Sequence, residues 1–234
     1  MTKRVLVTGA AGVVAGYVLP RLAERHALRL LDRRPVGLDV PGERVAADIT
    51  VFEQLLDACK GVDTVVHLAA EPSMHATFDA VLGPNIVGAY HVFEAAQRAG
   101  CARVVFASSI NSVFAYPLSM SVTPDLPVNP LNVYGASKCF GEALARSYAN
   151  RGLSALCVRI GKILAPGEAP PPPDDIYHQA WISARDLASV FDRCVAKESV
   201  DFAIVHALSR HANPRLSIES TCELLGYQPQ DGTI

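Results

Sequence analysis

The sequence lacks the features that mark membrane-spanning, secreted and nucleic-acid-binding proteins. No apolar run reaches the ~18 residues that cross a bilayer, and the apolar start over residues 5–7 breaks before Gly9, too early for a signal peptide. The six cysteines form no C-x-x-C pair and the seven histidines show no ligand spacing, which disfavours a disulfide framework or a metal site. The net charge is only −2, with no basic stretch. We therefore expect a cytoplasmic protein that binds no metal, membrane or nucleic acid.

The sequence is rich in short apolar runs that alternate with helical patterns. It has 234 residues, half of them hydrophobic, which is enough for one large core. The strands that we predict cover residues 4–8, 28–32, 45–47, 64–68, 103–107, 155–160 and 202–205. The helices that we predict cover residues 13–25, 52–59, 86–99, 133–150 and 218–225. This order predicts an α/β fold of the Rossmann type, a doubly wound parallel sheet with helices on both faces.

The last third of the chain is less regular. Residues 165–175 include four consecutive prolines, which predict a stiff loop, and a loop of this kind inside a domain is best interpreted as covering a site. Trp181–Ser183 is expected to lead into a further helix, with Ser183 as its N-cap. We see no linker, so residues 1–234 are expected to form one domain. Within it, residues 161–185 and the C-terminal tail would form a small substrate-binding portion.

The loop between the first predicted strand and helix has the pattern G-x-x-G-x-x-A. Gly9 permits a tight turn, Gly12 lets the backbone approach a pyrophosphate, and Ala15 lets helix and strand pack closely. The pyrophosphate would then lie on the helix N-terminus, where free N–H groups favour an anion. The alternative is an ordinary strand–helix turn.

Two acidic residues after the next strands extend this hypothesis. Asp32 ends the second strand, 20 residues after Gly12, where a carboxylate holds ribose hydroxyls and favours NAD. Arg33 and Arg34 follow, and because either can meet a 2′-phosphate, NADP stays open. Asp48 would flank the adenine or, equally, cap a helix.

Three residues form a candidate catalytic set. Tyr134 and Lys138 lie four apart, hence on one face of a helix, where an ammonium group lowers the pKa of a neighbouring phenol. Such a tyrosine exchanges protons near neutral pH. Ser109 follows the fifth strand, at the sheet edge where ligands bind, and would hydrogen-bond the substrate oxygen. The alternatives are an ordinary surface helix and, for Ser109, a cap on a turn into Asn111.

Together these motifs resemble the short-chain dehydrogenase/reductase superfamily, in its extended, epimerase-like branch. The matching elements run in order over residues 1–165: residues 8–15, Asp32, 48–49, 67–70, 85–88, 108–109, Tyr134, Lys138 and 159–161. The resemblance implies a Rossmann fold and a Ser109–Tyr134–Lys138 triad. It also implies an NAD or NADP site formed by Gly9, Ala11, Gly12, Val13, Asp32, Asp48, Ile49, Leu68, Ala69, Ala70, Asn85, Tyr134, Lys138 and Ile160. Asn85 would support the helix that carries the lysine, through water, or act as a helix N-cap.

Within that branch the chain is similar to bacterial uronate dehydrogenases, which oxidise a sugar acid at its anomeric carbon with NAD. The similarity includes residues 105–109, 134–142, 159–161, 181–183 and 225–231. It implies a compact sugar or sugar-acid substrate, a homodimer that packs through the helices at 86–99 and 133–150, and substrate contacts from Ser73, Ser109, Ile110 and Lys162.

Two departures concern the substrate. Ile110 stands where that group has asparagine, and residues 162–184 contain no arginine where that group binds a carboxylate. Lys162 or His178 would bind an anion instead, although lysine does not reproduce the bidentate grip of arginine.

Two other functions are less favoured. A nucleotide-sugar epimerase needs a large substrate lobe, whereas 96 residues follow Lys138. A dinucleotide sensor of the same fold often lacks the tyrosine or lysine, and both are present here. We therefore favour an oxidoreductase with a small-molecule substrate.

Overall fold

The computed structural model describes residues 2–233, and its centre is one parallel sheet of seven strands. The sheet has the order β3-β2-β1-β4-β5-β6-β9. Its strands are β1 Arg4–Thr8, β2 Ala27–Asp32, β3 Glu43–Ala46, β4 Thr64–His67, β5 Arg103–Ser109, β6 Ser154–Ile160 and β9 Phe202–Ala207. The winding reverses between β1 and β4, and ligands of open α/β sheets bind at the carboxyl ends of the strands beside such a reversal. The predicted doubly wound Rossmann fold is confirmed.

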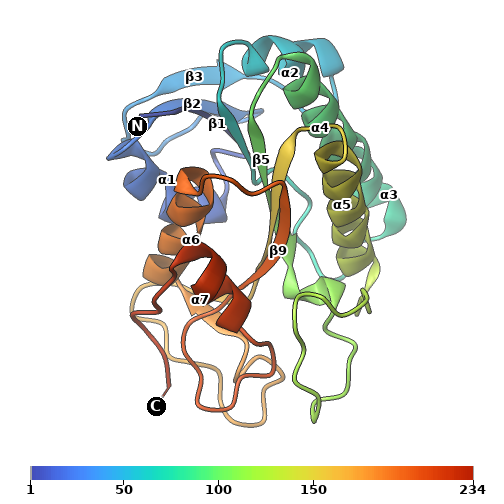
Figure 1. Cartoon of the computed structure of the whole chain (residues 1–234), viewed down its shortest axis with the longest axis vertical. Helices are drawn as coiled ribbons and strands as arrows, with labels where there is room; N and C mark the ends of the chain where they lie inside the picture. Colours follow the sequence, from blue (N-terminus) through green and yellow to red (C-terminus); the bar gives the residue numbers. More distant parts are fainter. Residues whose placement is uncertain (1, 234) are drawn as a thin grey trace.

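Helices cover both faces of the sheet (Figure 1). The helices are α1 Val13–Ala23, α2 Phe52–Cys59, α3 Phe78–Val81, α4 Gly88–Arg98, α5 Val133–Ala149, α6 Ala184–Ala196 and α7 Glu219–Leu225. One hydrophobic cluster joins α1 and α6 to one face of the sheet, and a second joins α2, α4 and α5 to the other. Because both faces are covered, the strand interiors are almost continuously apolar, which is why the sequence displayed them as unbroken runs.

The predicted helix over residues 86–99 differs in the structure. The helical segment begins at Phe78 in α3, continues as a π-helix over Leu82–Val87, and becomes α4 at Gly88. Pro84 lies within the π-helix and has no N–H to donate, so the regular α-helical hydrogen-bond ladder cannot pass through this residue. Asn85 is inside this segment, so its interpretation as a helix N-cap is wrong.

A second, two-stranded sheet was not predicted. It pairs β7 Lys162–Leu164 with β8 Trp181–Ser183 in parallel, so the residues expected only as a helix entry form a strand. The predicted cap is confirmed, because Ser183 Oγ accepts a hydrogen bond from Asp186 N at 3.1 Å at the start of α6. The proline loop spans the gap between these two short strands without helix or strand of its own.

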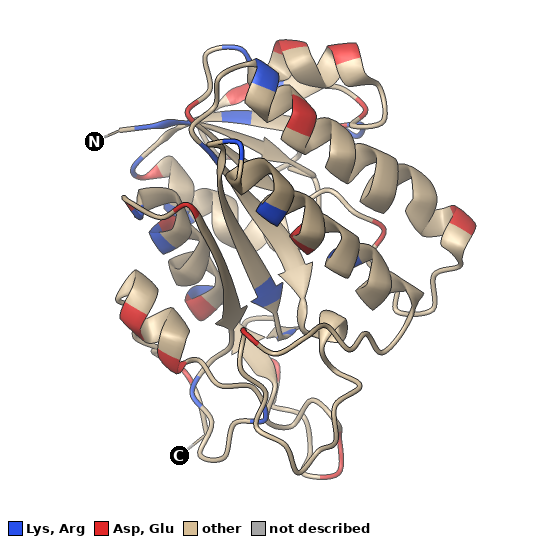
Figure 2. Cartoon of the chain, turned by 45° about the vertical axis from the view of Figure 1, so that its right-hand side comes forward, with Lys and Arg blue, Asp and Glu red and all other residues tan. Residues whose placement is uncertain are grey.

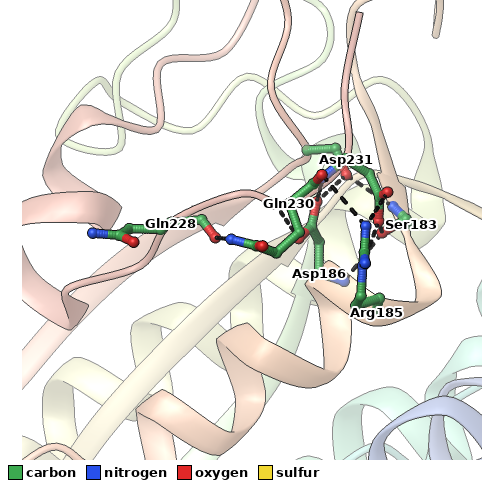
Figure 3. Close-up of polar contacts among 7 residues, drawn as sticks. Ser183, Arg185, Asp186, Gln228, Gln230 and Asp231 are labelled. Atoms are coloured by element: carbon green, nitrogen blue, oxygen red, sulfur yellow. Dashed lines mark hydrogen bonds and ion pairs between the residues drawn. The ribbon is translucent and has the colours of Figure 1, made fainter.

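The C-terminal tail is held against the first turn of α6 (Figure 3). Asp186 is fully buried, and its carboxylate accepts hydrogen bonds from the backbone N–H groups of Gln230 and Asp231 and from Ser209 Oγ. Asp231 in turn accepts from Ser183 Oγ at 2.7 Å and pairs with Arg185 at 2.5 Å. The tail therefore braces the β7–β8 sheet.

Charged residues are distributed over the helices and loops with both signs interspersed (Figure 2). The helices that the structure describes include none long and apolar enough to cross a membrane. The six cysteines are all free thiols.

The close approach of α5 to the sheet depends on Gly141. A Cβ atom at this position would lie 2.1 Å from the Phe106 ring of β5. We expect Gly141→Ala to lower the free energy of unfolding by about 1–3 kcal/mol, the usual cost of overpacking a core. Gly16→Ala in α1 is the matched control. Its Cβ would meet nothing within 4 Å, so we expect it to stabilise by about 0.5–1 kcal/mol. Urea denaturation measures both, and equal effects would contradict the packing argument.

Candidate active site

Two adjoining cavities open where the strands end at the reversal of the sheet. The first has a volume of about 490 Å³ and is lined by Gly9, Gly12, Val13, Leu31, Asp32, Arg33, Arg34, Ala47, Asp48, Ile49, Thr50, Leu68, Ala69, Ala70, Pro72 and Pro84. The second has a volume of about 300 Å³ and contains Ser108, Ser109, Tyr134, Lys138, Ile160, Gly161 and Ile163 in its wall. Gly9, Gly12, Val13, Leu68, Ala70 and Pro72 line both. A ligand that extends from one cavity into the other would cross the glycine loop.

The glycine loop is built to bring the backbone close to a ligand. Gly9 has φ +73°, and a Cβ atom there would lie 2.6 Å from the Ala69 nitrogen, so the turn requires glycine. Gly12 is the N-cap of α1, and no side chain caps it, so the first N–H groups of the helix lack intrahelical partners. These groups and the helix dipole give the cavity an anion-binding wall.

Asp32 lies in the first cavity, as the spacing predicted. Its Oδ2 accepts a hydrogen bond from Ala11 N at 3.0 Å, and its Oδ1 accepts from Arg34 N at 2.9 Å. The carboxylate thus fixes the glycine loop on one side and retains acceptor capacity for a ligand hydroxyl. Ala11 itself does not line either cavity and acts here through this bond.

Asp48 and Ile49 line the same cavity. Asp48 Oδ1 accepts hydrogen bonds from Thr50 N and Thr50 Oγ1, both at 2.8 Å, and the bond from the Thr50 backbone is the main reason that its pKa is lowered. Arg33 Nη1 lies 3.5 Å from Asp48 Oδ2. The N-cap of α2 is Val51, so the alternative that Asp48 caps this helix is wrong.

The structure brings Ser109, Tyr134 and Lys138 together in the second cavity. Ser109 is the last residue of β5, and the other two lie one turn apart at the start of α5, whose N-cap Asn132 accepts from Gly135 N at 2.7 Å. Lys138 Nζ lies 5.6 Å from the centroid of the Tyr134 ring and donates to the Ala107 carbonyl at 2.9 Å. The helix face predicted from the four-residue spacing therefore points at the end of β5.

Burial dominates the protonation of this set. It raises the pKa of Tyr134 to about 12, while a hydrogen bond with Ser109 acts in the opposite direction. It also lowers the pKa of Lys138 to about 8. The net shift is therefore opposite to the lowering that we expected from Lys138, because desolvation of the phenolate dominates. At neutral pH the phenol is protonated and is placed to donate or exchange a proton.

Asn85 directly contacts the helix that carries Tyr134 and Lys138. Its Nδ2 donates to Ser137 Oγ at 2.8 Å, and Ser137 Oγ donates to the Tyr134 carbonyl at 2.7 Å. Its Oδ1 accepts from Glu71 N at 2.7 Å. Asn85 therefore links the loop after β4 to the first turn of α5 without a bridging water.

An ion pair beneath the candidate catalytic set was not predicted from the sequence. Arg159 of β6 makes a bidentate contact with Glu142 of α5, at 2.8 and 2.9 Å, and both side chains are buried. Ser108 Oγ donates to Glu142 Oε1 at 2.6 Å. The available signal was an arginine inside an otherwise apolar strand, since such a charge is buried only when it is paired.

Asn111 was also missed as a site residue. It donates from Nδ2 to Ser109 Oγ at 3.1 Å, and its backbone N–H donates to the same oxygen at 3.2 Å. Ser109 therefore caps the turn into Asn111, as the alternative stated, and also faces the cavity.

Of the four residues expected to contact the substrate, only Ser109 lines the second cavity. Ile110 is buried in a hydrophobic cluster with Phe114 and Leu208, so it faces away from the cavity. In β7, Ile163 lines the cavity, whereas its neighbour Lys162 does not. Ser73 is exposed, and its Oγ accepts from His75 N at 3.2 Å.

The glycine loop, the acidic end of β2 and the Ser109–Tyr134–Lys138 set are the features of a Rossmann nucleotide-binding protein. The profile of the NAD dependent epimerase/dehydratase family matches residues 5–190, and the chain belongs to this family.

The relatives cover nearly the whole chain. It is 34% identical over 254 residues to the NAD-dependent glucose-6-phosphate dehydrogenase of Haloferax volcanii, covering 100% of this chain and 95% of that protein. It is 34% identical over 232 residues to the uronate dehydrogenase of Agrobacterium fabrum, covering 98% and 85%. A mutant uronate dehydrogenase from Agrobacterium tumefaciens, crystallised in complex with NAD, matches with a TM-score of 0.88 at 33% identity over 99% of this chain and 86% of that one.

The buried lysine makes stability depend on pH. The pKa of Lys138 is about 8 in the folded protein, below the ordinary 10.5, so burying the charged form destabilises the protein below pH 8. This penalty diminishes as the pH rises from 8 to 10.5, because only the unfolded chain then holds the proton. We expect Lys138→Met to be more stable than the wild type at pH 7, by on the order of 2–3 kcal/mol, and the difference to shrink by pH 10.

Chemical denaturation at pH 7, 8.5 and 10 measures this difference. Lys162→Met, at a partly exposed position outside both cavities, provides the control for the same side-chain change. A difference in stability between Lys138→Met and the wild type that is the same at all three pH values would contradict the argument.

Proposed function

We propose that this protein is an NAD-dependent oxidoreductase that transfers a hydride between nicotinamide and a compact sugar or sugar acid. The observation that carries the proposal is the placement of Ser109, Tyr134 and Lys138 in a cavity that adjoins the glycine-loop cavity. Relatives named as NAD-dependent glucose-6-phosphate dehydrogenase and uronate dehydrogenase, each 34% identical over almost the whole chain, support the substrate class.

The residues of the first cavity fit a dinucleotide. The N–H groups at the start of α1 would hold the pyrophosphate, and Asp32 would accept from the adenosine ribose. Ile49 and Asp48 would flank the adenine. Leu68, Ala69 and Ala70 would line the cofactor along its length. When bound, NAD supplies the hydride acceptor, and the protein supplies binding, orientation and proton transfer.

The residues of the second cavity would handle the substrate oxygen. Ser109 Oγ fixes that oxygen by a hydrogen bond. Tyr134 exchanges a proton with it, as base when the alcohol is oxidised and as acid in the reverse direction. Because burial raises the pKa of the phenol to about 12, the phenolate needs a positive charge nearby, and Lys138 provides one. Residues 161–185 would form the substrate side of the pocket.

Removal of the Tyr134 hydroxyl tests the proton-transfer role. We expect Tyr134→Phe to retain NAD binding and to lose turnover by a factor of about 100 to 10,000, the usual contribution of general acid–base catalysis. NADH formation monitored at 340 nm measures turnover, and calorimetry with NAD is the control for an intact cofactor site. Turnover equal to that of the wild type would end the proposed role.

Asp32 tests the choice of cofactor. We expect Asp32→Ala to weaken NAD binding more than NADP binding, because the carboxylate accepts from a ribose hydroxyl in one and repels a phosphate in the other. Titration of both cofactors into the variant and the wild type measures the ratio. The bond from Ala11 N is lost with either cofactor, so it cancels in that ratio. An unchanged ratio would place the ribose contact elsewhere.

The state of the protein in the cell is part of the proposal. We propose a cytoplasmic homodimer that packs through α4 and α5. The partly exposed Tyr90 of α4 and Val133 of α5 offer apolar surface for this contact, and the free thiols suit a reducing compartment.

A further inference from the structure

The turn that follows the proline loop holds Tyr177 against the segment that follows β4, where its hydroxyl contacts Met74. Asp175 Oδ1 accepts a hydrogen bond from Tyr177 N at 2.7 Å, and the Tyr177 carbonyl accepts from Ala180 N at 2.9 Å. Trp181, the residue after Ala180, begins β8, which the C-terminal tail braces. The backbone at Tyr177 is therefore fixed on both sides, although the loop before it lacks regular structure.

The ring of Tyr177 is fixed as well. It stacks on the Phe114 ring with a centroid distance of 5.1 Å and an interplanar angle of 8°. Phe114 is buried, and the Arg215 guanidinium lies 3.9 Å from its ring centroid and donates from Nη2 to the Phe114 carbonyl at 2.7 Å. The aromatic pair is thus a rigid platform that holds the Tyr177 hydroxyl in one place.

That hydroxyl lies where three loops meet. It donates to Met74 Sδ at 2.9 Å, in the segment that follows β4, and Pro72 of the same segment lines both cavities. The Asn111 side chain adjoins the same hydroxyl, and it donates to Ser109 Oγ at 3.1 Å. One residue therefore separates the Tyr177 hydroxyl from the oxygen that would hold the reacting centre.

The contact with Met74 is a weak substitute for a better partner. A thioether sulfur is a poor acceptor compared with a hydroxyl oxygen. Exchange of that sulfur for a substrate hydroxyl would therefore strengthen the hydrogen bond of Tyr177. Asn111 offers an amide that both donates and accepts, which suits a second hydroxyl of the same ligand.

The groups around Tyr177 suit an uncharged ligand. A carboxylate that leaves water needs charge-assisted donors. The Arg215 guanidinium is engaged by the carbonyls of Phe114 and Tyr116, and its unpartnered Nε is fully buried. Lys162 lines neither cavity, and Lys138 is engaged by the Ala107 carbonyl. Hydroxyl, amide, thioether and aromatic groups remain, together with the His178 imidazole, whose Nδ1 is engaged by the Pro171 carbonyl at 2.6 Å.

We propose that Tyr177 is a specificity-determining residue that donates a hydrogen bond to a ring hydroxyl of an uncharged aldose, with Asn111 as its partner. This inference rests on the proposed function and narrows its substrate class from sugars and sugar acids to neutral sugars.

The test combines a substrate panel with a matched pair of variants. NADH formation is measured with D-glucose, D-galactose, L-arabinose, D-glucuronate and D-galacturonate. Tyr177→Phe keeps the stacked ring and removes only the hydroxyl. Tyr116→Phe is the control, since Tyr116 belongs to the same aromatic region but its hydroxyl donates at 3.0 Å to the Pro127 carbonyl.

We expect kcat/KM to be highest for a neutral aldose. In Tyr177→Phe the KM for that sugar should rise about tenfold, as for loss of one hydrogen bond, while kcat and the KM for NAD change less than twofold. Tyr116→Phe should leave all three constants unchanged. This split separates substrate recognition from a general structural defect, which would lower kcat and cofactor affinity together.

Two outcomes would overturn this inference and leave the proposed function intact: a preference for the uronates, or an unchanged sugar KM in Tyr177→Phe. The absence of turnover with every sugar, with NAD still bound, would overturn the proposed function itself and this inference with it.

Discussion

The buried pair of Arg159 and Glu142 connects the three elements on which the candidate site depends. It joins β6 to α5, and the hydrogen bond from Ser108 to the same carboxylate adds β5. Replacing one member of such a pair leaves an unpaired charge in the core, which typically costs about 3–5 kcal/mol. The residue after Ser108 is Ser109, and the residue one turn before Glu142 is Lys138. The ion pair thus fixes the relative position of two catalytic candidates that belong to different elements.

Close backbone packing also fixes α5 against the sheet. Cβ atoms at Gly135 and Gly141 would lie 2.3 Å from the Asn111 carbonyl oxygen and 2.1 Å from the Phe106 ring. Both glycines are on α5, so the helix touches the sheet and the turn after it with its backbone. On the same face, Lys138 is consequently buried and Tyr134 partly buried, and this desolvation moves their pKa values in opposite directions.

The parts of the fold that depend on local pattern could be predicted from the sequence. The seven strands of the main sheet and the glycine loop followed from apolar runs and spacing, since each is determined within a few residues. The π-helix around Pro84 was not predicted, because the apolar period of a helix does not report which hydrogen bonds it makes. The pairing of β7 with β8 depends on a contact across the proline loop, and short strands with no alternation carry little local signal.

The site shows the same division. Ser109, Tyr134 and Lys138 were identified because family spacing places them, whereas Asn111 and Glu142 act through partners that only the folded chain brings near. Ile110 and Lys162 illustrate the reverse case. Each lies beside a cavity residue in sequence, but a strand or a tight turn directs neighbouring side chains to opposite sides. The segments proposed to recognise the substrate are therefore more distant in sequence, and the stacked rings of Phe114 and Tyr177 join two of them, the loops after β5 and β7.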